Sequence, residues 1–310
     1  MRVPFVQAVE RVLADDERAV FLTGDLGYKA LEGVAARFGA RFLNAGVAEQ
    51  NMMGVAAGLA LTGLRPWVYS IAPFVTYRCL EQIRNDVCLH DLPVRIVGNG
   101  GGYTYGIMGS THHTLEELAA LKPLPNMRLF FPCSNNHVTA AVHAMKDLDG
   151  PSYLRLSISA FQSDQAPLSE NPRTLTRRYR SRSPGARGVT IVGAGHAAQL
   201  LVRALESDSA KGLECDVFGL ATFPFDLEAD RDLVRSVEET RRVLFVEEHY
   251  ASGGIGESFA AELAGKMDEF VRMNAVYRKD QRYGSPAFHA QQCGMTPDAV
   301  VAEARALAGV

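Results

Sequence analysis

A single carboxylate stands at the start of an otherwise apolar segment in the first third of the chain. Glu49 follows the loop residues 44–48, and the segment that it opens carries apolar residues at helical spacing as far as Ala60. A glutamate in the first turn of a helix can simply offset the positive end of the helix dipole. For an arbitrary glutamate in this position the dipole explanation is the favoured one, and the alternative is a role in acid–base chemistry.

Two further segments carry side chains that could act in a site. Phe74 and Tyr77 begin an apolar stripe at helical spacing that continues to Val87, and most of this stripe predicts core packing. Residues 98–113 form a glycine-rich loop that ends in His112 and His113. A lone histidine in a loop is usually structural, and no second ligand pair stands at the spacing of a zinc site.

Composition narrows the class of protein. The chain has 310 residues, is 47% hydrophobic and 22% charged, and carries a formal net charge of −3. This balance gives no electrostatic case for binding nucleic acid or an acidic membrane. No apolar run approaches a membrane span, the N-terminus does not read as a signal peptide, and the five cysteines form no CxxC pair. We therefore expect a cytoplasmic protein with reduced thiols, and neither a membrane nor a nucleic acid as partner.

Strand-like runs alternate with helical patterns along the whole chain, which predicts the α/β class. We expect two domains, each an open, mostly parallel sheet flanked by helices, at residues 1–160 and 188–310. Residues 161–187, which include a basic run, predict a solvated linker between them. The expected strands are 19–23, 65–71, 94–97, 127–131 and 152–156 in the first domain and 189–195, 214–220 and 242–248 in the second.

Several of these segments resemble one enzyme family. Residues 44–60 are similar to the segment around the catalytic glutamate of transketolases, which use thiamine diphosphate. Residues 74–87 and the Gly-x-Thr-His pattern that ends at His112 resemble two further transketolase segments, and residues 246–256 resemble the C-terminal domain of that family. The resemblance covers nearly the whole chain, but only the pyrimidine-binding and C-terminal domains of a transketolase.

The resemblance implies a role for five residues of this sequence. Glu49 would meet the ring nitrogen N1′ of the cofactor's aminopyrimidine, and Phe74 would stack on that ring. Tyr77 is a weaker candidate for the same pocket, and Asp25 would also belong to the cofactor site. His112 would be catalytic and would reach the substrate's oxygens at the reacting carbons.

The family's diphosphate-binding domain is absent from this sequence. That domain carries a Gly-Asp-Gly motif with a downstream Asn, which hold magnesium and the diphosphate, and Gly24-Asp25-Leu26 is not that motif. The chain therefore resembles the C-terminal subunit of a split transketolase. We expect an N-terminal partner subunit that supplies the Mg²⁺ ligands, and an α2β2 heterotetramer in which this chain dimerises. The implied reaction moves a two-carbon ketol unit from a ketose donor to an aldehyde acceptor.

Some positions depart from the transketolase pattern where that family binds sugar phosphates. Met108 stands in place of an Asp that reads a substrate hydroxyl, and Gly100 in place of a phosphate-contacting His. Ile158 replaces a phosphate-clamping Arg, and Lys29 replaces a Ser; only Arg2 aligns with a retained phosphate contact. We therefore expect a non-standard acceptor, which is either deoxygenated or has its anionic group elsewhere, near Lys29 or the arginines of the linker. A carrier-bound or nucleotide-linked acceptor is a further alternative.

Three alternatives remain open. The chain could be the beta subunit of a 2-oxo acid dehydrogenase, which has the same two domains, although residues 48–51 and 111–112 favour transketolase. It could resemble deoxyxylulose-phosphate synthase, although Phe74 is more typical of transketolase. A catalytically silent scaffold is the third alternative, and the presence of Glu49, Phe74 and His112 argues against it.

Overall fold

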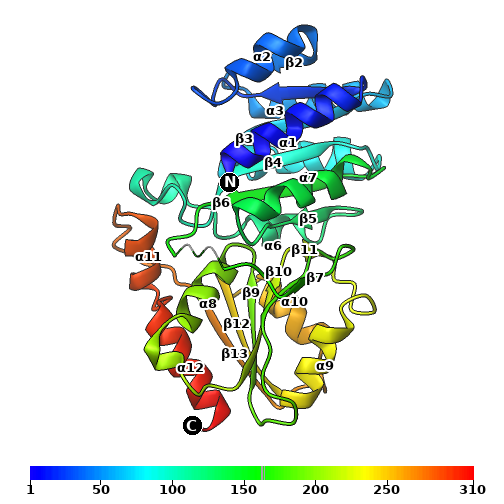
Figure 1. Cartoon of the computed structure of the whole chain (residues 1–310). Helices are drawn as coiled ribbons and strands as arrows, with labels where there is room; N and C mark the ends of the chain where they lie inside the picture. Colours follow the sequence, from blue (N-terminus) through cyan, green and yellow to red (C-terminus); the bar gives the residue numbers. More distant parts are fainter. Residues whose placement is uncertain (162, 164) are drawn as a thin grey trace. The chain divides into compact units, whose positions relative to one another are not determined.

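The computed structural model describes residues 1–161, 163 and 165–310, which divide into two compact units (Figure 1). Unit 1 contains residues 1–101, 120–130 and 135–157. Unit 2 contains residues 102–119, 131–134 and 158–310. Each unit has its own sheet, so the predicted architecture of two α/β domains is confirmed.

The sheet of unit 1 has the strand order β5-β6-β4-β3-β1-β2, and all of these strands run parallel. Its strands are β1 (Ala19–Thr23), β2 (Phe42–Asn44), β3 (Arg65–Ile71), β4 (Arg95–Gly101), β5 (Arg128–Phe130) and β6 (Ser152–Ser157). The continuous apolar run of β1 is buried at all five positions, as expected for a central strand covered on both faces.

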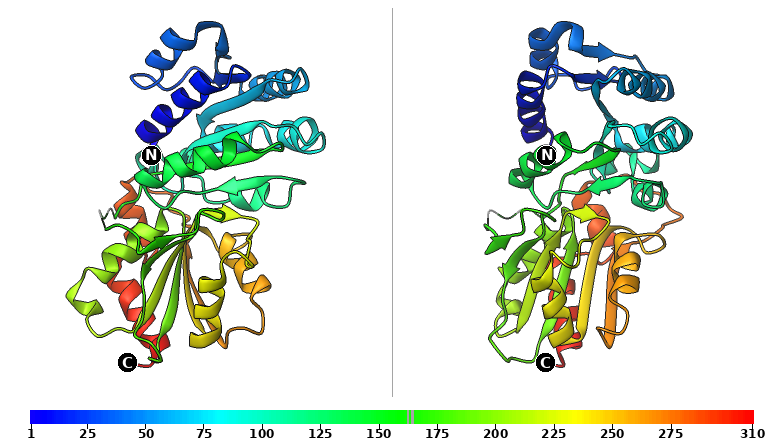
Figure 2. Two further views of the ribbon diagram at one scale, coloured as in Figure 1. Left: turned by 45° about the vertical axis from the view of Figure 1, so that its right-hand side comes forward. Right: turned by 90° about the vertical axis from the view of Figure 1, so that its right-hand side faces the viewer.

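Helices cover both faces of this sheet (Figure 2). The helices of the first 150 residues are α1 (Arg2–Asp15), α2 (Glu32–Phe38), α3 (Glu49–Leu61), α4 (Ala72–Thr76), α5 (Leu80–Gln82), α6 (Glu117–Leu121) and α7 (Val138–Lys146). Helices α1 and α7 pack together on one face, and α3 and α4 lie on the other. Phe5 of α1 stacks on Tyr69 of β3 with ring centroids 5.5 Å apart, and both residues are buried. This aromatic contact fixes α1 against the centre of the sheet.

The sheet of unit 2 has the strand order β13-β12-β9-β10-β8-β7. Its strands are β7 (Ser169–Glu170), β8 (Arg177–Arg180), β9 (Val189–Ala194), β10 (Cys215–Leu220), β12 (Arg242–Tyr250) and β13 (Glu269–Ala275); a short β11 spans Thr222–Phe223. Four strands are parallel, and β8 joins β10 antiparallel. The helices are α8 (Ala197–Leu205), α9 (Arg231–Thr240), α10 (Ile255–Glu262), α11 (Pro286–Gln292) and α12 (Pro297–Ala308). Figure 1 shows α8 and α12 on one side of this sheet and α9 and α10 on the other.

Most of the basic run from Arg177 to Arg182 belongs to this sheet, as strand β8 (Arg177–Arg180), rather than to a solvated linker. Strand β8 pairs with both β7 and β10. Arg178 and Arg182 both donate to the buried Asp216 on β10, over 2.6 and 3.0 Å, and Ser236 adds a third hydrogen bond. The run of basic residues wrongly predicted a solvated linker, because carboxylates that are distant in the sequence neutralise these arginines in the fold.

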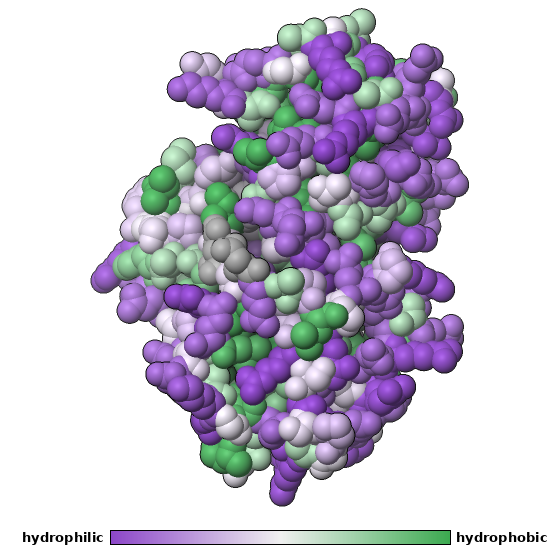
Figure 3. Space-filling model, viewed as in Figure 1, coloured by the Kyte–Doolittle hydropathy of each residue, from purple (hydrophilic) through white to green (hydrophobic). Residues whose placement is uncertain are grey.

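The polarity of the surface and of the helices bears on the question of membrane association. The face shown in Figure 3 is mostly hydrophilic, with apolar residues scattered across it. Over the part of the chain that the structure describes, every helix is too short or too polar to cross a membrane.

The Asp216 network generates a prediction about stability and pH. Burial alone would raise the pKa of Asp216, but hydrogen bonds from Arg178, Ser236 and the Arg182 backbone outweigh it and hold that pKa below the usual value. A lowered pKa in the folded chain adds stability above the unfolded value, and this stability disappears as the pH falls through the folded value. We expect Asp216→Asn to cost ~3 kcal/mol of unfolding free energy at pH 7, because it leaves two arginines without their shared carboxylate.

Urea denaturation at pH 7 and between pH 5 and pH 3 measures this effect. The difference between the variant and the parent chain should shrink below about pH 4, where the carboxyl group protonates in the unfolded chain. Asp208→Asn is the matched control, since Asp208 is exposed and pairs with Lys211 three residues away. Equal stability of the two variants would contradict the prediction.

Candidate active site

Glu49 lies where the strand order of unit 1 changes direction. The chain passes from β1 outward to β2, and then returns through α3 to β3 on the other side of β1. In open parallel sheets this switch leaves a crevice at the carboxyl ends of the strands, and ligands bind there. Gly24 directly follows β1, and a side chain there would lie within 3.5 Å of Glu49 Oε1. The sequence therefore folds so that Glu49, at the first position of α3, faces the switch point.

The Glu49 carboxylate is 1% exposed and has a partner on each oxygen. Ser70 of β3 donates from its hydroxyl to Oε1 over 3.1 Å, and Arg78 donates from Nη1 to Oε2 over 2.6 Å. Ser70 is itself completely buried, so its rotamer is fixed by the core. An arrangement of this kind holds the carboxylate in one orientation and lets Oε2 face the more open side.

The Phe74 ring is linked to this carboxylate through Arg78. The guanidinium carbon of Arg78 lies 4.6 Å above the centre of the Phe74 ring. The Arg78 side chain is 41% exposed, whereas the Glu49 side chain is 2% exposed. Arg78 therefore bridges the buried acid and the aromatic ring from the solvent side.

Sequence reasoning assigned no role to Ser70 or Arg78. The position of Arg78 in the sequence could have indicated its contact with Phe74. It follows Phe74 by four residues, and residues at this spacing meet on one face of a helix. The sequence around Ser70 does not indicate its contact with Glu49, since that contact depends on how β3 lies beside α3.

Cys79 brings a thiol next to this site. It is completely buried, and its Sγ lies 3.5 Å from the carbonyl oxygen of Phe74. Burial, and then the negative charge of Glu49, raise the pKa of the Cys79 thiol to about 12. The thiol therefore stays protonated at neutral pH and is not a nucleophile.

The other cofactor and substrate candidates of unit 1 lie around the same edge of the sheet or on its helices. Asp25 has a left-handed backbone (φ 46°), and its backbone N–H and side chain both contact the Asn44 amide. This exchange ties the loop after β1 to the loop before α3. Lys29 is exposed, and its ammonium group lies over the Tyr28 ring. Tyr77 is 38% exposed, and Arg2 is the exposed first residue of α1.

Met108 and His112 belong to unit 2 and are described with it. Met108 ends a 3₁₀ turn (Gly106–Met108) and is 50% exposed. His112 ends the next 3₁₀ turn (Ser110–His112), and its Nδ1 lies 3.0 Å from the Thr111 hydroxyl. The two turns meet at Gly109, whose φ of 82° favours glycine.

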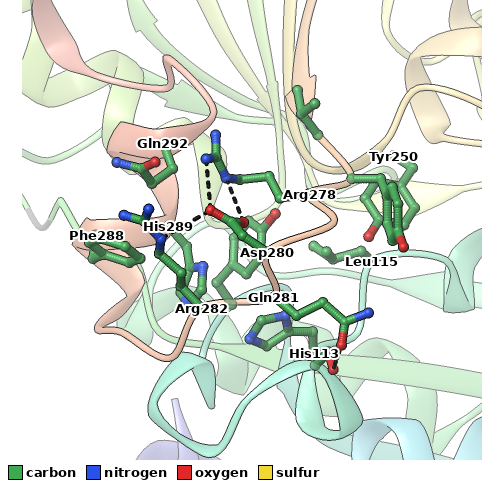
Figure 4. A pocket seen from close by; sticks show the side chains of 14 residues that line it. His113, Leu115, Tyr250, Arg278, Asp280, Gln281, Arg282, Phe288, His289 and Gln292 are labelled. Carbon is green, nitrogen blue, oxygen red and sulfur yellow. Dashed lines mark hydrogen bonds and ion pairs between the residues drawn. The ribbon is translucent and has the colours of Figure 1, made fainter.

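His113 points to a different surrounding from its neighbour. It packs edge-on against Tyr103 and His289, which stack on each other with centroids 4.7 Å apart. Burial and the nearby His289 lower the pKa of His113, so it is neutral at pH 7. These three rings line a pocket of unit 2, which Figure 4 shows. In the same pocket, Arg278 and Arg282 share the carboxylate of Asp280. These contacts support a structural role for His113.

Comparison with family models identifies both domains. Residues 1–162 match the pyrimidine-binding domain of transketolase, and residues 180–300 match the transketolase C-terminal domain. The chain therefore belongs to the transketolase family, and the resemblance stated from the sequence is confirmed.

Individual relatives are components of split enzymes. The chain is 30% identical to one of the subunits of apulose-4-phosphate transketolase from Phocaeicola vulgatus, over 82% of this chain and 80% of the relative. It is 32% identical to the SqwH subunit of 6-deoxy-6-sulfo-D-fructose transketolase from a Clostridium species, over 86% of this chain and 81% of the relative. A solved structure titled "Split gene transketolase, inactive beta4 tetramer" matches with a TM-score of 0.83 and 28% identity, covering 99% of this chain and 98% of that one.

Proposed function

We propose that this chain is one subunit of a split, thiamine-diphosphate-dependent enzyme that transfers a two-carbon ketol unit from a ketose to an aldehyde. The observation that carries the proposal is the buried Glu49 carboxylate at the switch point of unit 1, which Ser70 orients and which Arg78 links to the Phe74 ring. Membership of the transketolase family and the similarity to two split-transketolase subunits support it.

The residues around Glu49 fit an aminopyrimidine in their chemistry. Arg78 presents a planar N–H group to Glu49 and its face to Phe74. An aminopyrimidine ring would need the same two partners, a carboxylate at its edge and an aromatic ring on its face. When bound, thiamine diphosphate would supply the carbon nucleophile that accepts the ketol unit.

The chain's own residues would orient the ring and hold its protons. Glu49 would share a proton with the ring nitrogen, and Ser70 would keep the carboxylate turned toward it. Phe74 would fix the plane of the ring, with Tyr77 and Asp25 at the edge of the same site. His112 would donate hydrogen bonds to the substrate's oxygens near the reacting carbons.

Magnesium and the diphosphate would be held by a partner subunit. Among the described residues, no group of three or more His, Cys, Asp or Glu side chains could hold a metal ion. Helix α3 offers a surface for association: a methyl group at Gly54 or Gly58 would meet no atom within 4 Å, and Val55 is 42% exposed. We propose a heterotetramer of two such chains and two diphosphate-binding partners, located in the cytoplasm.

The proposal predicts that the purified chain alone is inactive, even with thiamine diphosphate and magnesium added. The similar solved structure, which is titled an inactive beta4 tetramer, is consistent with this expectation. Activity should appear when a chain with the Gly-Asp-Gly domain is added at equal concentration, and light scattering should then report the mass of an α2β2 assembly. Ketol transfer by the chain alone would contradict the proposal.

Glu49→Gln should lower turnover of the assembled enzyme by ~10²–10⁴, because an amide cannot share a proton with the cofactor ring. Steady-state kinetics of the reconstituted complex measures this effect, with gel filtration to establish that the variant still assembles. Glu81→Gln is the matched control, since Glu81 is exposed in the nearby α5. Wild-type turnover by an assembled Glu49→Gln complex would remove Glu49 from the mechanism.

The same complex distinguishes the alternative functions. Release of carbon dioxide from pyruvate would identify a 2-oxo acid dehydrogenase or a deoxyxylulose-phosphate-synthase-like enzyme rather than a ketol transferase. A complex that forms but binds no thiamine diphosphate would identify a silent scaffold.

The acceptor is proposed to differ from that of an ordinary sugar-phosphate transketolase. Met108 and Ile158 are half-exposed apolar residues where transketolases usually carry polar substrate contacts. The two similar subunits are themselves named for apulose 4-phosphate and for 6-deoxy-6-sulfo-D-fructose. Two arginines of the basic run, Arg178 and Arg182, are already paired with Asp216, which makes them weaker candidates for binding an anion. We therefore favour Lys29, with Arg2, for the anionic group.

This proposal predicts poor transfer from xylulose 5-phosphate to ribose 5-phosphate. We expect kcat/KM below about 10⁴ M⁻¹s⁻¹, the lower end of the usual enzyme range, because lost charge-assisted hydrogen bonds weaken substrate binding. The Met108→Asp, Ile158→Arg double variant should improve the transfer, and a Met108→Leu, Ile158→Leu variant serves as its control. Efficient transfer by the unmodified complex would show that ordinary sugar phosphates are accepted.

A further inference from the structure

We propose that Arg78 stands in for the aminopyrimidine ring at Glu49 and Phe74, and that it must leave both residues before the cofactor can bind. This inference rests on the proposed function, because it assumes that Glu49 and Phe74 receive the ring. It assigns to Arg78 a positioning role and a competing role.

The two contacts of Arg78 are the two contacts that the ring would need. Its Nη1 lies 2.6 Å from Glu49 Oε2, and its guanidinium carbon lies 4.6 Å above the Phe74 ring. A guanidinium group is planar, carries N–H donors at its edge and stacks on aromatic faces. It therefore shares with a protonated aminopyrimidine both its shape at this point and its hydrogen-bonding edge.

Glu49 needs such a partner because its carboxylate is buried. Without Arg78 the carboxylate would lose its charged partner and keep the hydrogen bond from Ser70, at an exposure of 1%. Burying a carboxylate without a compensating charge is costly, whereas a paired carboxylate is tolerated. Arg78 thus neutralises Glu49 and covers Phe74, so that the chain can fold with the site intact before any cofactor arrives.

The same contacts make Arg78 a competitor. The Oε2 atom and the face of Phe74 that Arg78 covers cannot serve the guanidinium group and the ring at the same time. Arg78 is free to withdraw, since its side chain is 41% exposed and has a long flexible stem. The apparent affinity for the cofactor is then the intrinsic affinity reduced by the fraction of molecules in which Arg78 has withdrawn.

Binding of thiamine diphosphate to the assembled complex tests the competition. Isothermal titration at fixed magnesium should give a dissociation constant about tenfold lower for Arg78→Ala than for the parent complex, since the variant leaves both contacts open. Arg84→Ala is the matched control: Arg84 lies in the same segment, is exposed and donates a hydrogen bond to its neighbour Asn85. The control should bind the cofactor like the parent.

A second measurement needs only this chain without cofactor. Arg78→Ala should lower the urea midpoint of unfolding, because it removes the ion-pair partner of the buried Glu49 carboxylate. In the Glu49→Gln background the same substitution should have a much smaller effect, because no charge remains to be neutralised. Equal effects in the two backgrounds would overturn the stand-in, even if the variant complex proved too unstable for titration.

The outcomes separate this inference from the proposed function. If the parent complex binds no thiamine diphosphate, the proposed function fails. If the parent binds it and Arg78→Ala binds equally well or more weakly, the proposed function stands and the stand-in is wrong, since Arg78 then either does not compete or contacts the bound cofactor. Tighter binding together with non-additive stability supports the inference.

Discussion

The burial of one carboxylate is the constraint on which the site of unit 1 depends. Glu49 can exist at 1% exposure only because each oxygen has a donor, Ser70 from β3 and Arg78 from the turn after α4. The N-terminus of α3 adds a favourable dipole at the same point. The strand order around β1 brings these pieces together, and Gly24, at the end of β1, lies next to the carboxylate. The fold of unit 1 thus holds a buried carboxylate in place with residues from several segments, which no single segment could do alone.

Most of the architecture could be predicted from local pattern. The bounds of β1 and β3 agree with the expected strands, because continuous apolar runs are a direct signal of buried strands. Strand β2 has only three residues and lacks such a run. Strand β8 is rich in arginine, and its place in the sheet depends on Asp216, which stands 38 residues further along from Arg178. Elements held by distant charges cannot be found from periodicity.

The candidate site could be predicted only in part, and for a related reason. Glu49 and Phe74 came from segments that resemble a known family, and the structure places both beside Arg78. Ser70 sits in an ordinary apolar strand, so its type carries no signal until β3 is placed next to α3. His112 groups with unit 2, although the family model for the pyrimidine-binding domain spans residues 1–162. Compact units and family boundaries therefore describe different properties of the chain: one records packing, and the other records descent.

Because most of the basic run forms β8, its susceptibility to proteolysis depends on the stability of the sheet of unit 2. Four arginines in six residues, from Arg177 to Arg182, make this the densest stretch of tryptic sites in the sequence. A protease must draw an extended segment into its cleft, but this backbone is hydrogen-bonded to β7 and β10, and the arginine side chains are engaged by Glu170 and Asp216. Cleavage here therefore requires the edge of the sheet to open first, and its rate reports the free energy of that local opening. The rate of cleavage at a segment that the sequence predicts to be an exposed linker would therefore measure the local stability of the sheet of unit 2.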